Sequence, residues 1–219
     1  GVLMRRVGLP DDAFADPDAR LSVDQFKRLM REGKALSGEP ALALHFGASI
    51  SFEELTIVGL ICHAAETMVE AFEQMNRYGR LVIEVEGVSD GERFKIVRRD
   101  GAIWIEDTRS NPDEFPELTE STLGRFIVTT NRIFSDPPMY EAAEVTYPAP
   151  AHADAYEELL GVPVTFGAAR NAMRVHEVFL TQRIAPRRKY VFAPLTKQAD
   201  SLMAELETAS TVKGKVEAV

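Results

Sequence analysis

The stretch that decides the fold is FKIVRRDGAIWIE, residues 94–106. Its two halves, Phe94–Arg98 and Ala102–Glu106, alternate in polarity or carry β-branched residues, and the Asp100-Gly101 pair between them is typical of a tight hairpin turn. Leu81–Glu86 has the same character, and Ser89–Gly91 is a second turn signal. The sequence therefore predicts a three-stranded antiparallel meander.

The first eighty residues have helical periodicity instead. Val2–Leu9 resembles the last turns of a helix, so we expect the chain to begin inside an element of a longer parent. Ser22–Gln25 is a capping-box pattern that opens a helix, and Ser37–Pro40 ends it. A short helix over Ala41–Phe46 is then expected to stop at Gly47.

Two further helices are predicted before the meander. Leu55–Ala65 is apolar nearly all round, which suits a helix buried between other elements. Cys62 lies in it, where a thiol is expected to be an inert packing residue. Thr67–Glu70 is a second capping box, and the helix that it opens presents Ala71, Phe72, Met75 and Tyr78 inward.

Helices and strands alternate after the meander. A helix is expected over Pro116–Phe134 and a last one with Thr196 as its N-cap. Between them the sequence predicts a strand, a helix closed by Gly161 and two strands, at Ala143–Tyr147, Ala153–Leu160, Pro163–Phe166 and Ala172–Leu180. This order predicts an α+β fold, in which an N-terminal helical layer packs on a mostly antiparallel sheet with further helices between strands.

Composition excludes several classes of protein. The formal net charge is −9, and the one dense basic cluster, Arg183 with Arg187–Lys189, is interpreted as a solvated linker, so this chain is a poor nucleic-acid binder by itself. Leu55–Ala65 is too short to span a bilayer, and Gly1–Pro10 is unlike a signal peptide. A single cysteine excludes an internal disulfide. We expect a cytoplasmic protein with no membrane contact.

No catalytic, metal or cofactor motif stands out. The four histidines, His45, His63, His152 and His176, have no i, i+3 or i, i+4 spacing. The chain has no phosphate loop and no nucleophile elbow. Its carboxylate pairs, such as Glu53-Glu54 and Glu157-Glu158, are adjacent in sequence and would diverge on a helix. The sequence thus predicts neither an enzyme nor a metal or cofactor site.

Aromatic and polar residues on the predicted sheet and helices could line a cavity, although each would serve equally well as ordinary core. Small-molecule sites are mostly apolar with a few placed polar groups. The candidate ligand-binding residues are Trp104, Phe126, Asn131, Phe134, Tyr140, Phe166, Asn171, His176 and His63.

Three stretches together resemble the arabinose-binding-type N-terminal domain of AraC-type transcriptional regulators. The first is Asp16–Leu21, followed after a helix by Ser37–Leu44. The second is Leu60–Tyr78, with its Thr67–Phe72 pattern. The third and most specific runs from Val145–Pro150 through Tyr156–Ala168 and Asn171–Leu180 to Pro194-Leu195. Val88–Glu117 is least like the family, and the family's helix-turn-helix part, due soon after residue 210, is absent.

The resemblance implies an effector-sensing regulatory domain over residues 1–195 and a linker helix over 196–219 toward the missing DNA-binding domain. It implies that the domain senses a small effector. Our hypothesis is that this effector is apolar or amphipathic and lies between the helical layer and the sheet, against Trp104, Phe126 and Phe166. DNA would be met only through the missing domain, and a homodimer is plausible within the family. Three alternatives stay open: an enzyme with His63 or His176 as acid–base, a haem sensor with His63 as axial ligand, and a dimerisation module without a pocket.

Overall fold

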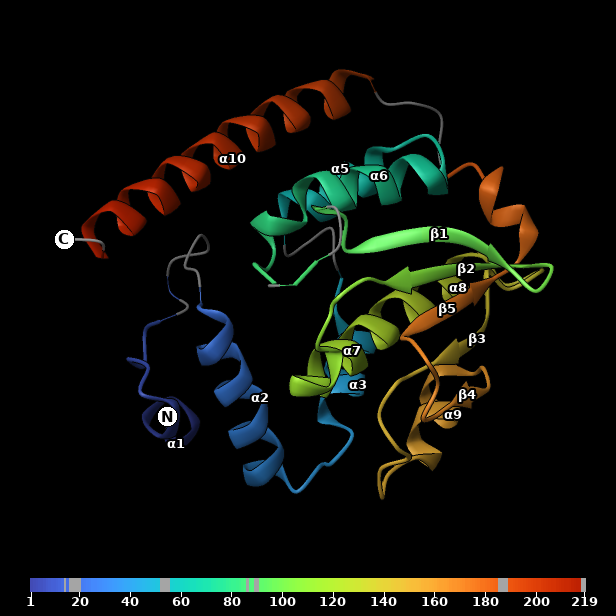
Figure 1. The fold of residues 1–219 in the computed structure, drawn as a ribbon, viewed down its shortest axis with the longest axis horizontal. Coiled ribbons are helices and arrows are strands. Elements are labelled where there is room, and N and C mark those ends of the chain that lie inside the picture. Colours follow the sequence, from blue (N-terminus) through green and yellow to red (C-terminus); the bar gives the residue numbers. More distant parts are fainter. Residues whose placement is uncertain are drawn as a thin grey trace. The chain divides into compact units, whose positions relative to one another are not determined.

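The computed structural model of the protein describes residues 1–13, 15, 21–51, 56–85, 87–88, 91–184 and 189–217. Contacts divide the chain into two compact units. Unit 1 comprises Gly1–Ile50, Val97–Asp107 and Asn111–His176, and unit 2 comprises Ser51–Ile96, Thr108–Ser110 and Glu177–Val219. Figure 1 labels the elements in chain order.

A five-stranded sheet has the order β1-β2-β5-β3-β4. β5 pairs antiparallel with both β2 and β3, whereas β3 and β4 are parallel. The first three residues of β1 fall in unit 2 and the rest of the sheet in unit 1. The predicted α+β class and mostly antiparallel sheet are confirmed. The strands are β1 (Phe94–Arg99), β2 (Ala102–Asp107), β3 (Tyr140–Glu144), β4 (Val164–Thr165) and β5 (Ala172–Val175).

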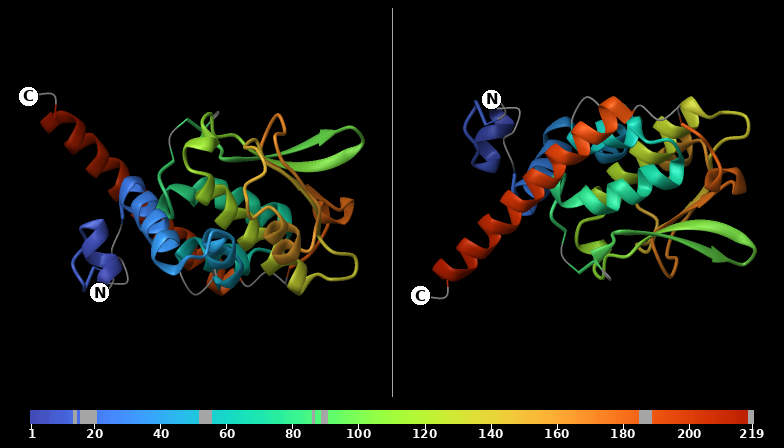
Figure 2. Two further views of the ribbon diagram at one scale, coloured as in Figure 1. Left: turned by 90° about the horizontal axis from the view of Figure 1, so that it is seen from below. Right: turned by 90° about the horizontal axis from the view of Figure 1, so that it is seen from above.

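The hairpin of β1 and β2 turns where the sequence predicts, and both views of Figure 2 show the two strands side by side. Asp100 and Gly101 have φ of 52° and 77°. Positive φ at both central residues is what a type I′ turn needs, and this turn matches the right-handed twist of the flanking strands. The Asp-Gly pair therefore sets the register of the hairpin.

The sheet has one apolar and one polar face because side chains alternate along a strand. Ile103 pairs with Val175 and Ile105 with Met173, and all four are buried. Trp104 pairs with Arg174 on the opposite face. The apolar face therefore supplies the core of this part of unit 1.

The helices of unit 1 follow the predicted periodicity, and several caps are confirmed. The backbone N–H of Gln25 donates to Ser22 Oγ, and that of Ser22 donates to Gln25 Oε1, which completes the capping box. Gly38 and Gly161 end their helices in the left-handed region. The helices are α1 (Val2–Val7), α2 (Val23–Ser37), α3 (Leu42–Ser49), α7 (Pro116–Leu123), α8 (Thr129–Ile133) and α9 (Asp154–Leu160), with a π-helical turn (Gly124–Val128) between α7 and α8.

Gly47 does not stop its helix, so that prediction is wrong. α3 continues to Ser49. A Cβ built on Gly47 would lie 2.1 Å from the carbonyl oxygen of Ser121, and one on Gly124 would lie 2.5 Å from that of Leu44. The glycine is needed because α3 approaches α7 and the π turn backbone to backbone, and not because the helix ends there.

The predicted strand over Leu81–Glu86 is also wrong. A 3-10 turn, η1 (Gly79–Leu81), follows α6, and 82–85 have no regular structure. Leu81 and Val82 pack instead against the helical core of unit 2, which covers their apolar side chains without a strand partner. Glu86 and the turn residues Ser89 and Asp90 lie outside the described residues.

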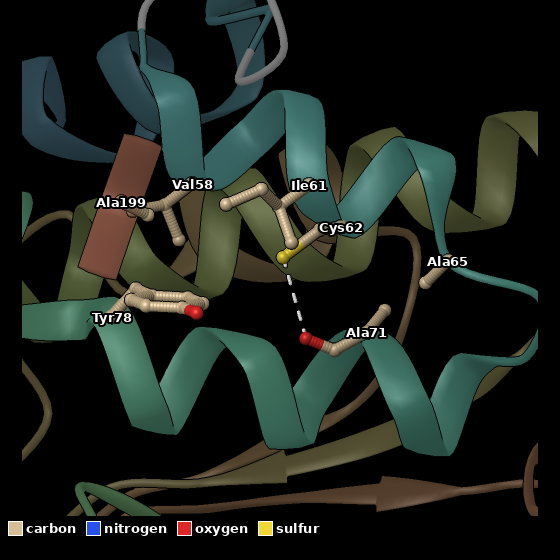
Figure 3. Packing of buried hydrophobic residues seen from close by; sticks show 7 residues of the cluster. All are labelled: Val58, Ile61, Cys62, Ala65, Ala71, Tyr78 and Ala199. Atoms are coloured by element: carbon tan, nitrogen blue, oxygen red, sulfur yellow. Dashed lines mark hydrogen bonds between the residues drawn. The ribbon is translucent and has the colours of Figure 1, made fainter. Parts of the chain in front are cut away.

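Unit 2 is built from α5 (Ile57–Ala64), α6 (Met68–Tyr78), a 3-10 turn η5 (Glu177–Leu180) and α10 (Lys189–Glu217). Its core joins α5, α6 and α10, as Figure 3 shows. Cys62 is buried there, and its thiol donates to the carbonyl oxygen of Ala71 at 3.3 Å. The buried helix and the packing role of Cys62 agree with the sequence analysis. The core residues are Val58, Ile61, Cys62, Ala65, Ala71, Tyr78 and Ala199.

The second capping box is only half formed. Thr67 Oγ1 accepts from the N–H of Glu70, whereas the Glu70 carboxylate accepts from the N–H of Glu66 at 2.7 Å. The strand predicted over Ala172–Leu180 ends at Val175, and η5 follows it.

Thr196 is not an N-cap, because α10 begins at Lys189 and encloses Pro194. Its hydroxyl donates to the carbonyls of Phe192 and Ala193, an alternative use for a threonine inside a helix. Arg183 pairs with Glu66 at 2.6 Å, while Arg187 and Arg188 lie outside the described residues. Within the described part of the chain, neither α10 nor any other helix combines the length and apolarity needed to cross a membrane.

Candidate functional site

Helix α7 is polar in sequence but buried in structure. Its acidic and hydroxyl side chains, Glu117, Thr119, Glu120, Ser121 and Thr122, are all buried. The close approach of α3 covers this helix, because Gly47 and Gly124 let the two backbones touch. Ser121 and Thr122 donate their hydroxyls to the carbonyl of Leu118. The carboxylates of Glu117 and Glu120 cannot donate to a carbonyl of the helix in this way, so their role depends on the residues that other elements place around them.

Glu120 is the centre of a hydrogen-bonded group. Its Oε1 accepts from the hydroxyl of Tyr156 at 2.7 Å and lies 3.3 Å from His152 Nε2. The hydroxyl of Tyr147 lies 3.0 Å from that of Tyr156. Glu120 is only 3% exposed. Tyr156 belongs to α9, and His152 lies in the segment just before it. The short helix α9 therefore positions the Tyr156 hydroxyl against Glu120.

A lysine from α2 completes the group. Lys34 Nζ lies 3.5 Å from Glu117 Oε1 and 4.0 Å from Glu120 Oε2. We call the whole set the Glu120 cluster: Lys34, Glu117, Glu120, Tyr147, His152 and Tyr156. All its members belong to unit 1.

The other oxygen of Glu117 and one oxygen of Glu120 are unsatisfied. Glu117 Oε2 and Glu120 Oε2 are buried and have no hydrogen-bond partner among the residues that the structure describes. Buried polar atoms are normally hydrogen-bonded, and each exception needs an explanation. A bound polar ligand is one such explanation.

Aromatic rings form one side of the cluster. Tyr156 stacks on His152 with ring centroids 5.7 Å apart and meets Phe166 edge to face at 5.0 Å. Burial raises the pKa of Tyr156 far above its usual value, and Tyr147 and Glu120 raise it further. The phenol therefore stays protonated and remains a hydrogen-bond donor to the carboxylate.

Two of the predicted ligand-binding residues adjoin this cluster. Phe166 packs on Tyr147 and Tyr156. Asn171 is buried, and its Oδ1 accepts from the N–H of Thr146 at 2.8 Å while its Nδ2 donates to Thr119 Oγ1 at 3.4 Å. Thr119 is on α7, so Asn171 joins the helix of the cluster to the segment after β3.

Four predicted residues lie elsewhere around α8 and the start of β3. Asn131 satisfies both backbone groups of Tyr140, donating to its carbonyl at 3.0 Å and accepting from its N–H at 2.8 Å. Burial raises the pKa of the Tyr140 phenol well above its usual range. Phe126 is buried in the π turn, and Phe134 is half-buried at the end of α8.

The last three predicted residues have other local surroundings. Trp104 lies on the polar face of the sheet, with the Arg99 guanidinium 4.2 Å from its ring centroid. His176 is half-buried after β5, and its N–H donates to the carbonyl of Met139. His63 is exposed on α5 in unit 2. Of the three aromatic residues expected around the effector, Phe166 touches the Glu120 cluster through its ring contacts with Tyr147 and Tyr156.

Sequence reasoning missed all six members of the Glu120 cluster. It assigned only the adjacent carboxylate pairs, such as Glu157-Glu158, to the surface, and it interpreted Pro116–Phe134 from its apolar stripe alone. A usable signal was present: Thr119, Ser121, Thr122 and Gly124 are the small residues that favour close helix contact. Such contact implies that the acidic residues between them are covered as well.

The arrangement has two chemical capabilities. A histidine beside a carboxylate can serve in acid–base chemistry, but Oε1 of Glu120 already accepts from Tyr156. The free oxygens can instead accept from a ligand. Within the described ranges, no three His, Cys, Asp or Glu side chains come together as a potential metal site.

The fold is an α+β domain in which the polar helix α7 is buried. Comparison with known families identifies it further, since a model described as the arabinose-binding domain of AraC transcription regulators, N-terminal, matches residues 1–184. The chain belongs to this family.

Two relatives agree. The ornithine utilization regulator of Pseudomonas aeruginosa is 24% identical over 201 residues, which are 90% of this chain and 57% of that protein. The crystal structure of transcriptional regulator CdpR from Pseudomonas aeruginosa has the same fold, with a TM-score of 0.54 and 17% identity over 87% of this chain and 57% of CdpR. The chain thus spans little more than half the length of either relative. The family and both relatives are transcriptional regulators, and neither comparison points to an enzyme or a haem sensor.

Proposed function

We propose that this domain binds a small effector at the Glu120 cluster and thereby controls DNA binding by a helix-turn-helix domain of the same regulator. The observation that carries the proposal is the pair of buried carboxylate oxygens, Glu117 Oε2 and Glu120 Oε2, which have no hydrogen-bond partner in the described part of the chain, although Lys34 Nζ lies 4.0 Å from Glu120 Oε2. Leaving buried polar groups unpaired costs free energy, which a ligand with donor groups would recover.

The proposed ligand is amphipathic and not purely apolar. Its polar end would meet the carboxylates of α7, and its apolar part would lie near Phe166. We retain Phe166 and Asn171 as ligand contacts, because both adjoin the Glu120 cluster. We do not include Trp104, His176 or His63 in the proposed site.

We propose that effector binding is transmitted to the DNA-binding domain through α2. Lys34 and Arg31 both extend from α2 toward the polypeptide around α7, Lys34 to the two carboxylates and Arg31 to the carbonyl of Glu114 at 3.0 Å. A ligand that competes for the carboxylates would bind more tightly to an arrangement in which α2 is held differently. Such differential affinity is what couples a binding site to a distant output.

The test is calorimetric titration and thermal shift of the domain with amino acids, sugars, fatty acids and aromatic acids, ornithine included. An effector that binds the wild type should bind at least about tenfold more weakly to Glu120→Gln, a loss of about 1.4 kcal/mol. Glu158→Gln is the matched control, because Glu158 is an exposed carboxylate on α9. Equal binding by both variants would refute the assignment of the site.

The role in DNA binding needs the longer regulator, in which residues 196–219 would act as the linker. With that protein, the effector should change affinity for operator DNA in the wild type and not in Glu120→Gln. We also propose a cytoplasmic location and a homodimer, which sedimentation at several concentrations would test. A visible absorbance band of the purified protein would favour the haem alternative instead.

A further inference from the structure

We infer that the group recognised by the Glu120 cluster is a cation, such as the ammonium or guanidinium of a small organic amine. This rests on the proposed function and specifies the chemistry of its ligand. The inference starts from charge. The cluster brings two carboxylates, those of Glu117 and Glu120, to a single ammonium, that of Lys34.

Burial makes this imbalance costly. Glu117 is 7% exposed and Glu120 3%. A carboxylate removed from water needs a charged or hydrogen-bonding partner, because removing one partner of a buried pair leaves an expensive lone charge. The Lys34 ammonium lies 3.5 Å from Glu117 Oε1 and 4.0 Å from Glu120 Oε2, which is too far for a hydrogen bond, and neither Oε2 atom has a hydrogen-bond partner in the described residues. Those two atoms are where a second cation would be bound.

The surrounding groups favour a cation over an anion. The Tyr156 hydroxyl is already directed at Glu120 Oε1 and stays protonated, so it neither supplies a new charge nor turns toward an incoming anion. An anion beside Lys34 would meet the two acids of α7. The faces of aromatic rings also attract cations. The rings of Tyr147, Tyr156 and Phe166 pack on one another, and Tyr156 is hydrogen-bonded to Glu120.

The experiment uses probes that share a four-carbon chain: 1,4-diaminobutane and the longer agmatine as cations, 1,4-butanediol as the neutral analogue and succinate as the anion. Each is titrated calorimetrically into the 219-residue domain. We expect binding of at least one cationic probe and none of the diol or succinate. Glu117→Gln and Glu120→Gln should each weaken it at least about tenfold, and Glu158→Gln should not.

Lys34→Met provides a second, independent variant. It removes the competing ammonium, so the cationic probes should bind about threefold or more tightly, a gain that mere structural damage would not produce. Far-ultraviolet circular dichroism establishes that each variant is folded.

The outcomes separate the two proposals. If succinate or the diol binds in a manner sensitive to Glu120→Gln and the amines do not, the cation inference is overturned while the site stands. If the amines bind equally to wild type and both Gln variants, or if none of the probes binds, the cation inference fails. If no compound of the broader panel binds in a manner sensitive to Glu120→Gln, the proposed function fails as well.

Discussion

The hydroxyl of Tyr156 donates a 2.7 Å hydrogen bond to Oε1 of Glu120 inside unit 1, and both residues are buried. The bond ties α9 to α7, two helices that are 36 residues apart at these positions. It is the best-formed interaction of the Glu120 cluster. The geometry therefore makes Tyr156 the residue that holds the acid in place.

Tyr156→Phe should destabilise the domain. The buried carboxylate would lose its short donor, which costs about 1–3 kcal/mol for a hydrogen bond of this kind. Urea unfolding followed by circular dichroism gives the change in the free energy of unfolding. Tyr190→Phe, at an 85% exposed tyrosine, is the control and should change stability by less than about 0.5 kcal/mol. Equal stability of the two variants would show that Glu120 does not depend on Tyr156.

Gly47→Ala should also destabilise the domain, because the new methyl group would clash with the backbone of α7 at Ser121. Overpacking of this kind costs about 1–3 kcal/mol. Gly79→Ala is the matched control, since its added Cβ would have nothing within 4 Å and its backbone is already helical. That variant should be neutral or more stable by about 0.4–1 kcal/mol. A tolerated Gly47→Ala would contradict the backbone contact.

Asn131→Ala separates a structural role from ligand binding. The side chain satisfies the N–H and the carbonyl of Tyr140, so its removal should lower the free energy of unfolding by about 1–3 kcal/mol. Asn111→Ala, at an exposed asparagine, should have little effect. Calorimetry of the folded Asn131→Ala variant should give unchanged effector affinity. A selective loss of affinity, with stability intact, would restore Asn131 as a ligand contact.

Tyr78 should make stability fall at high pH. Burial and the hydrogen bond to Asp200 raise the pKa of Tyr78 to about 12, whereas the positive charge of Arg77 lowers it by a smaller amount. The folded state thus holds the phenolic proton more tightly than the unfolded state does. The resulting stabilisation is complete below pH about 10, the unfolded pKa, and is lost as pH rises through about 12. Tyrosinate absorbance measured during alkaline titration reports the ionisation.

Asp200→Asn is the informative variant for this titration, because it removes the carboxylate that accepts from the Tyr78 hydroxyl. The pKa of Tyr78 should then move down toward 10, and less of the stability should be lost between the two pH limits. Tyr78→Phe identifies which absorbance step belongs to Tyr78. An identical titration curve for Asp200→Asn and wild type would exclude the hydrogen bond as a cause.

Several elements could be predicted from sequence because their signals are local. The capping box at Ser22, the Asp100-Gly101 turn and the buried apolar helix with Cys62 each depend on residues within a few positions of one another. The errors have a common origin. Gly47 and Leu81-Val82 carry ordinary local signals, and distant contacts gave them a different role. Thr196 carries a capping signal but lies inside a helix that begins earlier, at Lys189.

The amino-acid sequence by itself determined the α+β class, the order of helices and strands and the resemblance to AraC-type regulators, because periodicity and capping are written into neighbouring residues. Only the tertiary structure decided that Glu117 and Glu120 are buried. Their helix has the composition of an exposed one, and its burial depends on Gly47 of α3, Lys34 of α2 and Tyr156 of α9. The small residues of α7 indicate a close contact but not its partner, since whether a charge meets water or protein depends on which distant segments come to lie beside it.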